Sequence, residues 1–396
     1  MNLFEYLALK SYWGSRERDR VSIKQTAVKQ HNKVKPRKEP LIWAVINRNV
    51  RLKTHKTRLR LPGLVWLIAL FGAITSANAG SADHYAPGVM NIRDLIVPAP
   101  GLYGIIYNYF YTSDQFNDAN GNAVNSITIK PGPGPGLTLK VSPSIDIYAL
   151  TPMLAWVAPW KLDGIRFAAY VAPNFANSNI DAEISSLNGR GVNASTSSFG
   201  VGDLFVQPIW LGYTLQHWDF SLGYGFYAPT GRYNTLTFRL PIIGPVTTTA
   251  ADNIGLGFWT HQIQGMAAWY PWADQRMAVM AALTYQINSS KEGIDVTPGQ
   301  HLTLNWGISQ YLPLTKDQKL LLEVGPSGYD DWQITDDSGS AARNAAVHQE
   351  VHAAGGQVGL TYVPWNAALN FHAFYEYSAT ARLQGSAYDV SLAFKF

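Results

Sequence analysis

The stretch from Arg276 to Asn288 reads RMAVMAALTYQIN, and its side chains alternate between two kinds along its whole length. One set is apolar throughout and consists of Met277, Val279, Ala281, Leu283, Tyr285 and Ile287. The other set alternates with it and ends in the polar residues Thr284, Gln286 and Asn288. Because successive side chains of a β-strand point to opposite faces, this alternation predicts a long strand with one apolar face.

The same alternation recurs in residues 219–227, 301–309, 369–377 and 389–396. In the closing stretch, the apolar set is Val390, Leu392, Phe394 and Phe396. A strand that crosses a membrane alternates lipid-facing apolar residues with lumen-facing polar ones over about ten positions. A soluble β-sandwich alternates as well, so the pattern predicts an all-β fold without deciding between the two.

The lengths of the connections favour the barrel. Short turns are expected at residues 159–164, 215–218, 271–275, 313–318 and 364–367, whereas residues 111–137, 173–199, 230–252, 289–299 and 335–349 form long loops. Alternation of short turns and long loops is typical of outer-membrane barrels. The expected strands number about twelve, within two, and the first four lie near residues 102–111, 137–158, 165–173 and 199–213. This even number places both ends of the chain on the short-turn side.

Three local features predict irregularities. Pro143 and Pro152 donate no ladder hydrogen bond, so they should mark edges, bulges or a break in the strand. The alternation of residues 253–269 slips near His261, which predicts a β-bulge. The run PGPGPG at residues 131–136 predicts a solvated outer loop. Pro-Trp pairs at Trp160, Trp272 and Trp365 fall on short turns, where a periplasmic aromatic girdle is expected.

The first 79 residues predict a leader. Sixteen of the 31 basic residues and only four of the 27 acidic ones precede Leu61. The apolar run of residues 61–74 and the small residues through Ala79 then follow the pattern of a cleavable signal peptide. The apolar run is shorter than the roughly 20 residues of a membrane-spanning helix, so a retained anchor is the weaker alternative. The basic region is unusually long for a leader, which suggests an over-extended start or an atypical presequence.

Removing residues 1–79 changes the charge of the protein. The chain as a whole has a formal net charge of +4. The portion after residue 60 keeps 15 basic and 23 acidic residues and is therefore acidic. An acidic body excludes binding of nucleic acid through a basic surface. The chain has no cysteine, which excludes disulfides, thiolate nucleophiles and cysteine zinc sites.

No catalytic or metal-binding motif stands out. Ser309, His301 and Asn305 share one predicted face, but the G-x-S-x-G signature of a serine hydrolase is absent, so we expect no enzyme. His348 and His352 on a strand would lie about 13 Å apart, too far to chelate one ion. The acidic residues of the long loops lack the calcium-loop pattern, and we expect no metal and no cofactor.

The predicted lumen carries polar and charged residues of both signs. Those most suited to line a substrate path are Arg166, Asp203, Gln207, Arg276, Glu323, His372, Glu376 and Arg382. In a narrow barrel opposite charges pair and brace the interior. In a wider barrel they form a polar path that sets selectivity. The sequence leaves both alternatives open.

The sequences of several stretches resemble one protein family. They are GVGDLFVQPIWLGY (200–213), FSLGYGFYAPTGRY (220–233), NIGLGFWTHQIQ (253–264), LTLNWGISQYLPL (302–314) and VGPSGYDDWQITDDSG (324–339), with the closing residues 379–396. They are similar to the transporter-like barrel proteins of the MetA pathway of phenol degradation. The resemblance implies an outer-membrane barrel that admits hydrophobic or aromatic compounds, with no catalytic residues to carry over.

The expected organisation is therefore a leader over residues 1–79, an N-terminal segment over residues 80–101 and a transmembrane antiparallel β-barrel over residues 102–396. By analogy with channels for hydrophobic compounds, residues 80–101 could fold into the barrel as a plug. We expect passive uptake of small hydrophobic or aromatic molecules across the bacterial outer membrane. The alternative is a structural or adhesive barrel with a closed lumen. Expected partners are outer-membrane lipid, lipopolysaccharide and the barrel-assembly machinery, which would recognise Phe396.

Overall fold

The computed structural model describes residues 83–129, 137–186, 191–240, 244–250 and 253–396. The predicted leader, residues 1–79, and the PGPGPG run, residues 131–136, lie outside the described residues. Almost all regular structure in the described part is β-strand, and its one helix is the three-residue turn η1 (Val363–Trp365). No helix among these residues is long and apolar enough to cross a membrane.

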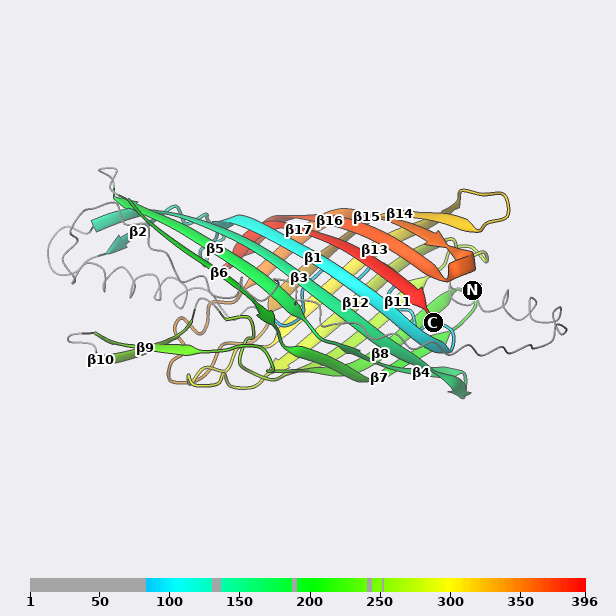
Figure 1. Ribbon diagram of the computed structural model, residues 1–396, viewed down its shortest axis with the longest axis horizontal. Coiled ribbons are helices and arrows are strands. Elements are labelled where there is room, and N and C mark those ends of the chain that lie inside the picture. The colour runs from blue at the N-terminus through cyan, green and yellow to red at the C-terminus, as the bar shows by residue number, and fades with distance from the viewer. Residues whose placement is uncertain (1–82, 130–136, 187–190, 241–243, 251–252) are drawn as a thin grey trace, which may run out of the picture.

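Twelve antiparallel strands form a closed barrel, as the alternation predicted (Figure 1). They are β1 (Gly101–Phe116), β3 (Leu137–Leu162), β4 (Ile165–Ala172), β7 (Leu204–Thr214), β8 (Trp218–Ala228), β11 (Thr260–Trp269), β12 (Met277–Asn288), β13 (His301–Pro313), β14 (Leu320–Gln333), β15 (Glu350–Tyr362), β16 (Ala367–Thr380) and β17 (Leu383–Lys395). Each pairs with its neighbour around the ring. β1 closes the ring because it pairs with both β3 and β17. Closure leaves no unpaired sheet edge at membrane depth.

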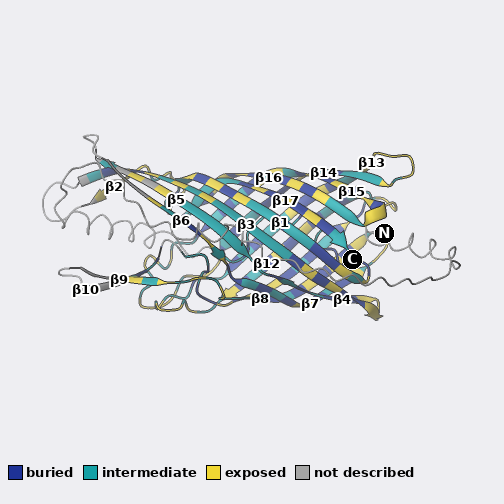
Figure 2. Ribbon diagram, viewed as in Figure 1, coloured by how far each residue is buried: buried dark blue, intermediate teal, exposed yellow. Residues whose placement is uncertain are grey.

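The two faces of the wall differ as the sequence predicted (Figure 2). Along β12, Ala278, Met280, Ala282, Thr284 and Gln286 are buried, and the residues between them are half-buried or exposed. β11 and β17 show the same alternation. The exposed set consists mainly of Leu, Ile, Val, Phe, Tyr and Trp side chains, so the outer surface of the barrel is apolar. Such an exterior is suited to lipid.

The ends of the barrel are distinguished by their connections. Gly101, where β1 begins, and Lys395, where β17 ends, lie at one rim, since Tyr103 pairs with Lys395. The short connections lie at this same rim, which we call the inner rim. One of them is the two-residue turn at Asp163 and Gly164, whose φ angles of 49° and 84° are the left-handed values that a tight hairpin requires. The opposite rim is called the outer mouth.

Aromatic side chains mark the inner rim. Trp160, Trp272 and Trp365, the three residues expected in a girdle, are 53%, 56% and 75% exposed there. Trp218 and Trp269 join them, with ring centroids 6.4 Å apart. Tryptophan prefers the boundary between lipid and water, so these side chains indicate where the hydrocarbon layer ends.

The two prolines of β3 lie where the strand has only one continuous partner. β3 itself is unbroken, but the neighbour on one side changes from β5 (Phe175–Ser186) to β4 between Leu150 and Leu154, and Pro152 falls in this gap. Pro143 lies beyond the last residue of β3 that pairs with β1, which is Ile145. The missing N–H groups therefore cost little ladder pairing.

Several expected boundaries were wrong. No bulge is found at His261, because β11 begins at Thr260 and residues 253–259 precede it as turns and irregular chain. The strand expected over residues 199–213 is two strands, β6 (Gly191–Val201) and β7. The long outer connections also contain strands, namely β2 (Ser126–Ile129), the β5–β6 hairpin, and the pair β9 (Thr235–Leu240) and β10 (Gly244–Thr249).

Candidate functional site in the barrel lumen

Residues 83–100, which we call the N-terminal segment, run through the lumen from the outer mouth to the inner rim. At one end, His84 bonds to Thr260, the first residue of β11 at the outer mouth. At the other end, the carbonyl of Val97 accepts a hydrogen bond of 2.8 Å from Arg166 at the start of β4. The segment contains only turns and irregular chain, so its polar groups bond to the barrel wall.

Ionic contacts hold the outer end of the segment. Asp83 lies 2.7 Å from Nδ1 of His301, and the same nitrogen is 3.4 Å from Asp331. Asp331 also accepts a hydrogen bond from Thr303 and pairs with Arg382 at 3.4 Å. These groups are almost fully buried except Arg382, so the opposite charges compensate one another inside the barrel.

A second contact lies beside this cluster. Nε2 of His84 is 2.9 Å from a carboxylate oxygen of Asp203, and both side chains are 4% exposed. The backbone N–H groups of Gly231 and Leu256 also donate to Asp203, which therefore ties the segment to two outer loops. Burial lowers the pKa of His84, although the hydrogen bond and charge of Asp203 oppose the shift.

Arg93 fixes the inner half of the segment. Its Nε atom lies 3.3 Å from Glu323 and donates to Ser309 at 2.9 Å. Its two terminal nitrogens donate to the backbone carbonyls of Gln275 and Arg276. The guanidinium also lies 4.2 Å from the centre of the Tyr311 ring, within the range of a cation–π contact. One buried side chain thus joins the segment to β13, β14 and the turn before β12.

Asp94 lies next to Arg93 in sequence but has different partners. Its carboxylate accepts hydrogen bonds from the hydroxyl of Tyr107 at 2.7 Å and from the side-chain amide of Asn91 at 2.8 Å. Burial raises the pKa of Asp94 to about 6, even though these donors favour the charged form. At neutral pH the lumen therefore holds a mostly ionised carboxylate at this depth.

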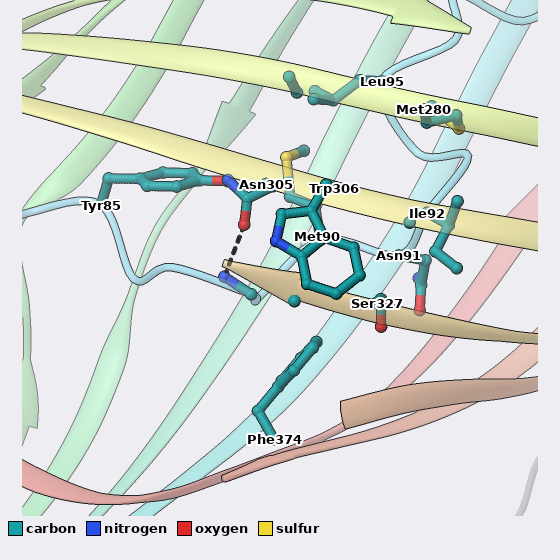
Figure 3. Close-up of a pocket in the computed structure, with 14 residues that line it drawn as sticks. Tyr85, Met90, Asn91, Ile92, Leu95, Met280, Asn305, Trp306, Ser327 and Phe374 are labelled. Atoms are coloured by element: carbon teal, nitrogen blue, oxygen red, sulfur yellow. Dashed lines mark hydrogen bonds between the residues drawn. The ribbon is translucent and has the colours of Figure 1, made fainter. Parts of the chain in front are cut away.

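The backbone of the segment bonds to wall amides between these anchors. The N–H of Gly88 donates to the side-chain oxygen of Asn305 at 2.9 Å (Figure 3). The N–H of Ile92 donates to Gln357 at 2.8 Å. A glycine is needed at position 88, where φ is +76° and a Cβ atom would lie 2.7 Å from the ring of Tyr329.

The structure places seven of the eight predicted lumen residues inside the barrel or at its mouth. Arg166, Asp203 and Glu323 contact the N-terminal segment. The other four contact the wall, and His372 also bonds to the backbone of Gly88 in the segment. Gln207 accepts a hydrogen bond from Tyr170, Glu376 accepts from Tyr111 and Tyr329, Arg382 pairs with Asp331, and His372 lies 3.5 Å from Asp389.

Arg276 is a correction. It precedes β12 at the inner rim, where its side chain is 40% exposed and lies 3.5 Å from Asp274 of the turn. The strand alternation was extended one residue too far, because the regular ladder begins at Met277. Only the backbone carbonyl of Arg276 contacts the N-terminal segment.

The hydrolase arrangement does not form. His301 and Ser309 are eight residues apart on β13, which corresponds to roughly 26 Å at the rise of a strand. Ser309 instead donates to Glu323 and accepts from Arg93. His348 and His352 bond to different carboxylates, Asp336 and Asp330. In the described residues, one group has the spacing of metal ligands, namely Asp83, His301 and Asp331 within 4.8 Å of one another.

A small pocket lies between the middle of the segment and the wall (Figure 3). The segment contributes Tyr85, Gly88, Met90, Asn91, Ile92 and Leu95, and the wall contributes residues of β12, β13, β14 and β16, among them Met280, Trp306, Ser327 and Phe374. Its volume of about 30 Å³ holds a water molecule, whereas benzene needs a cavity of about 150 Å³. Unless the pocket widens, no small aromatic molecule fits there.

The segment's own charged residues were missed as site candidates. Asp83, His84, Arg93 and Asp94 all find partners on the wall. The available signal was four ionisable residues within a short apolar stretch rich in proline, ahead of the first predicted strand. Ionisable groups in such a stretch need partners when it is buried.

Comparisons with known proteins agree with this architecture. The sequence matches the model of a family described as putative MetA-pathway of phenol degradation over residues 113–392. No curated protein sequence matches the chain. An outer-membrane channel from Pseudomonas putida F1 has a similar structure, with a TM-score of 0.51 and 15% identity over 79% of this chain and 100% of that one.

Two other solved structures resemble the chain more weakly. The monoaromatic hydrocarbon channel CymD has a TM-score of 0.38 and 8% identity, covering 81% of this chain and 97% of that one. A FadL homologue of Pseudomonas aeruginosa has a TM-score of 0.33 and 11% identity over the same shares of the two chains.

The family match and the closed barrel lead to one conclusion. The matched residues cover well over half of the sequence and include all or part of each barrel strand. A closed antiparallel barrel with an apolar exterior is the form in which β-strands cross the outer membrane of bacteria. The chain belongs to the family described as putative MetA-pathway of phenol degradation, and it is an outer-membrane β-barrel.

Proposed function

We propose that this barrel is a passive channel for small hydrophobic or aromatic molecules and that the N-terminal segment is its plug. The observation that carries the proposal is the segment itself, which runs through the lumen and leaves an apolar pocket against the wall. The family description, which refers to phenol degradation, supports an aromatic substrate.

The contacts of the segment are suited to a plug that can leave. The segment is continuous with β1 at Gly101, and its other contacts to the wall are non-covalent. Arg166, Asp203 and Glu323 hold it in the docked position, whereas Gln207, His372, Glu376 and Arg382 stay on the wall or at the mouth. Displacing the segment would expose these polar side chains as the lining of a path.

The proposal is tested by uptake of a hydrophobic fluorescent probe. Cells that produce the barrel should take up N-phenyl-1-naphthylamine faster than otherwise identical cells without it, because intact lipopolysaccharide is a poor path for apolar compounds. The matched control is a strain that produces the same amount of a barrel variant in which the plug is crosslinked to the barrel wall. Equal uptake rates in all three strains would reject a channel for hydrophobic molecules.

A second candidate is a structural or adhesive barrel that stays closed. The filled lumen and the β5–β6 and β9–β10 hairpins of the outer loops favour it. Planar-bilayer recordings separate the two, because a channel shows openings while a closed barrel stays silent under the same voltage. Persistent silence together with unchanged uptake would support the closed barrel.

We also propose that Phe396 is recognised by the barrel-assembly machinery and that the aromatic girdle and outer loops contact lipid and lipopolysaccharide. Phe396 is 69% exposed at the end of β17, and its ring lies 5.0 Å from that of Phe394. Deleting Phe396 should reduce the heat-modifiable, folded form in outer-membrane fractions. Deleting Leu314, an exposed residue of an inner turn, controls for loss of an apolar side chain at the same rim, and equal losses would contradict the proposal.

A further inference from the structure

The pocket between the segment and the wall contains two polar atoms without a partner. They are Oδ1 of Asn91 and the hydroxyl of Ser327, and each residue is 5% exposed. Figure 3 shows them on facing elements, Asn91 on the segment and Ser327 on β14. A buried polar atom that lacks a hydrogen bond is costly, so a site that keeps two of them invites a molecule that pairs with both.

We propose that this pocket is a subsite for a small apolar molecule that carries a single hydroxyl group, with Asn91 and Ser327 as its polar contacts. The inference rests on the proposed channel function and adds the chemistry that the path prefers. In the subsite, the ligand hydroxyl donates to Oδ1 of Asn91 and accepts from the hydroxyl of Ser327. One hydroxyl group supplies both interactions, since it is a donor and an acceptor at once.

The partners of Asn91 fix which of its atoms is free. Its Nδ2 atom donates to Asp94 at 2.8 Å and to the hydroxyl of Ser391 at 2.8 Å. Both hydrogens of the amide are therefore used, and the atom that faces the pocket unpaired is an acceptor. The site therefore requires a donor from the ligand, which a plain hydrocarbon lacks.

The neighbouring charge excludes anions. Asp94, which holds Asn91, is half-buried, and its nearest partners are hydrogen-bond donors rather than a cation. A ligand carboxylate would meet the negative charge of Asp94 beside this pocket, whereas a neutral hydroxyl would not.

The rest of the pocket accepts an apolar body. Met90 and Ile92 of the segment and Met280 and Phe374 of the wall line it. The pocket must widen to admit a ring, and methionine side chains adapt readily to a new shape.

Binding to the full chain in lipid nanodiscs tests the inference, with radiolabelled phenol, toluene and benzoate as probes and empty nanodiscs to correct for partition into lipid. Phenol should bind more tightly than toluene, and benzoate should not bind. The variant Ser327→Ala should weaken phenol binding by about threefold to tenfold, the usual value of one hydrogen bond, and leave toluene unchanged. Ser327→Thr keeps the hydroxyl and should restore the preference for phenol.

Ser221→Ala is the matched control, because Ser221 is a buried lumen serine of β8 that does not line the pocket. Equal affinity of the unaltered protein for phenol and toluene would overturn the inference, as would an equal loss for both probes in Ser327→Ala. These outcomes would not contradict the proposed channel function if uptake of N-phenyl-1-naphthylamine still depends on the barrel. Equal uptake with and without the barrel would instead contradict the proposed channel function.

Discussion

Oxidation of a cysteine pair introduced by Ile92→Cys and Gly307→Cys is expected to abolish uptake and channel openings, and reduction is expected to restore them. The pair joins the middle of the N-terminal segment to β13. A Cβ atom at position 307 would lie 2.8 Å from Cγ1 of Ile92, so two cysteines there are within disulfide range once the isoleucine atoms are removed. Because the pocket beside this contact holds only about 30 Å³, a locked segment blocks any aromatic molecule.

The chain is well suited to this experiment because it has no cysteine of its own. Uptake of N-phenyl-1-naphthylamine and bilayer openings are measured on the same variant, first oxidised and then reduced. The single variants Ile92→Cys and Gly307→Cys control for the loss of the isoleucine and for the added side chain. If the oxidised pair conducts as well as the reduced pair, the segment does not need to move and the plug proposal is wrong.

The barrel itself was predictable because its rules are local. Alternation along β12 and β13 assigned each residue to a face, and the burial of Thr284 and Gln286 agrees with that assignment. Positions of Pro-Trp pairs at short turns predicted the girdle at the inner rim. These signals work because lipid imposes one requirement, an apolar outer face, on every strand.

The outer hairpins escaped prediction for the opposite reason. The β5–β6 hairpin reaches beyond the closed ring. Residues 179–184 of β5 alternate between polar and apolar residues, but over only six positions, fewer than the roughly ten of a strand that crosses the membrane. The neighbouring strand β7 was merged with β6, because the break at Gly202 and Asp203 carries no proline or long polar run.

The contents of the lumen were only partly predictable. Glu323 lies inside the barrel and Asp203 at its mouth, and their partners Arg93 and His84 lie more than one hundred residues away in sequence. Charge pairing at that separation depends on the path of the N-terminal segment, which no repeating pattern encodes. Of the two alternatives left open for the lumen charges, pairing is the one observed, and much of it involves the segment.

The variant Arg93→Met is expected to release the segment and increase channel openings while the barrel stays folded. Arg93 pairs with Glu323 in a site where both side chains are less than a tenth exposed. Removing one partner of a buried ion pair costs about 3–5 kcal/mol, because the other charge stays buried without compensation. The barrel strands do not depend on this contact, so the cost falls on the docked position of the segment.

Hydrogen exchange of residues 83–100 and single-channel recordings measure the release. Faster exchange and more frequent openings are expected in Arg93→Met, and the double variant Arg93→Met/Glu323→Gln should recover part of the loss because it no longer buries an unpaired charge. Lys319→Met is the matched control, since Lys319 pairs with Asp317 at 2.7 Å on an exposed turn, where an ion pair contributes about 0–1 kcal/mol. Unchanged exchange in Arg93→Met would mean that the remaining contacts, from Asp83 to Val97, hold the segment without Arg93.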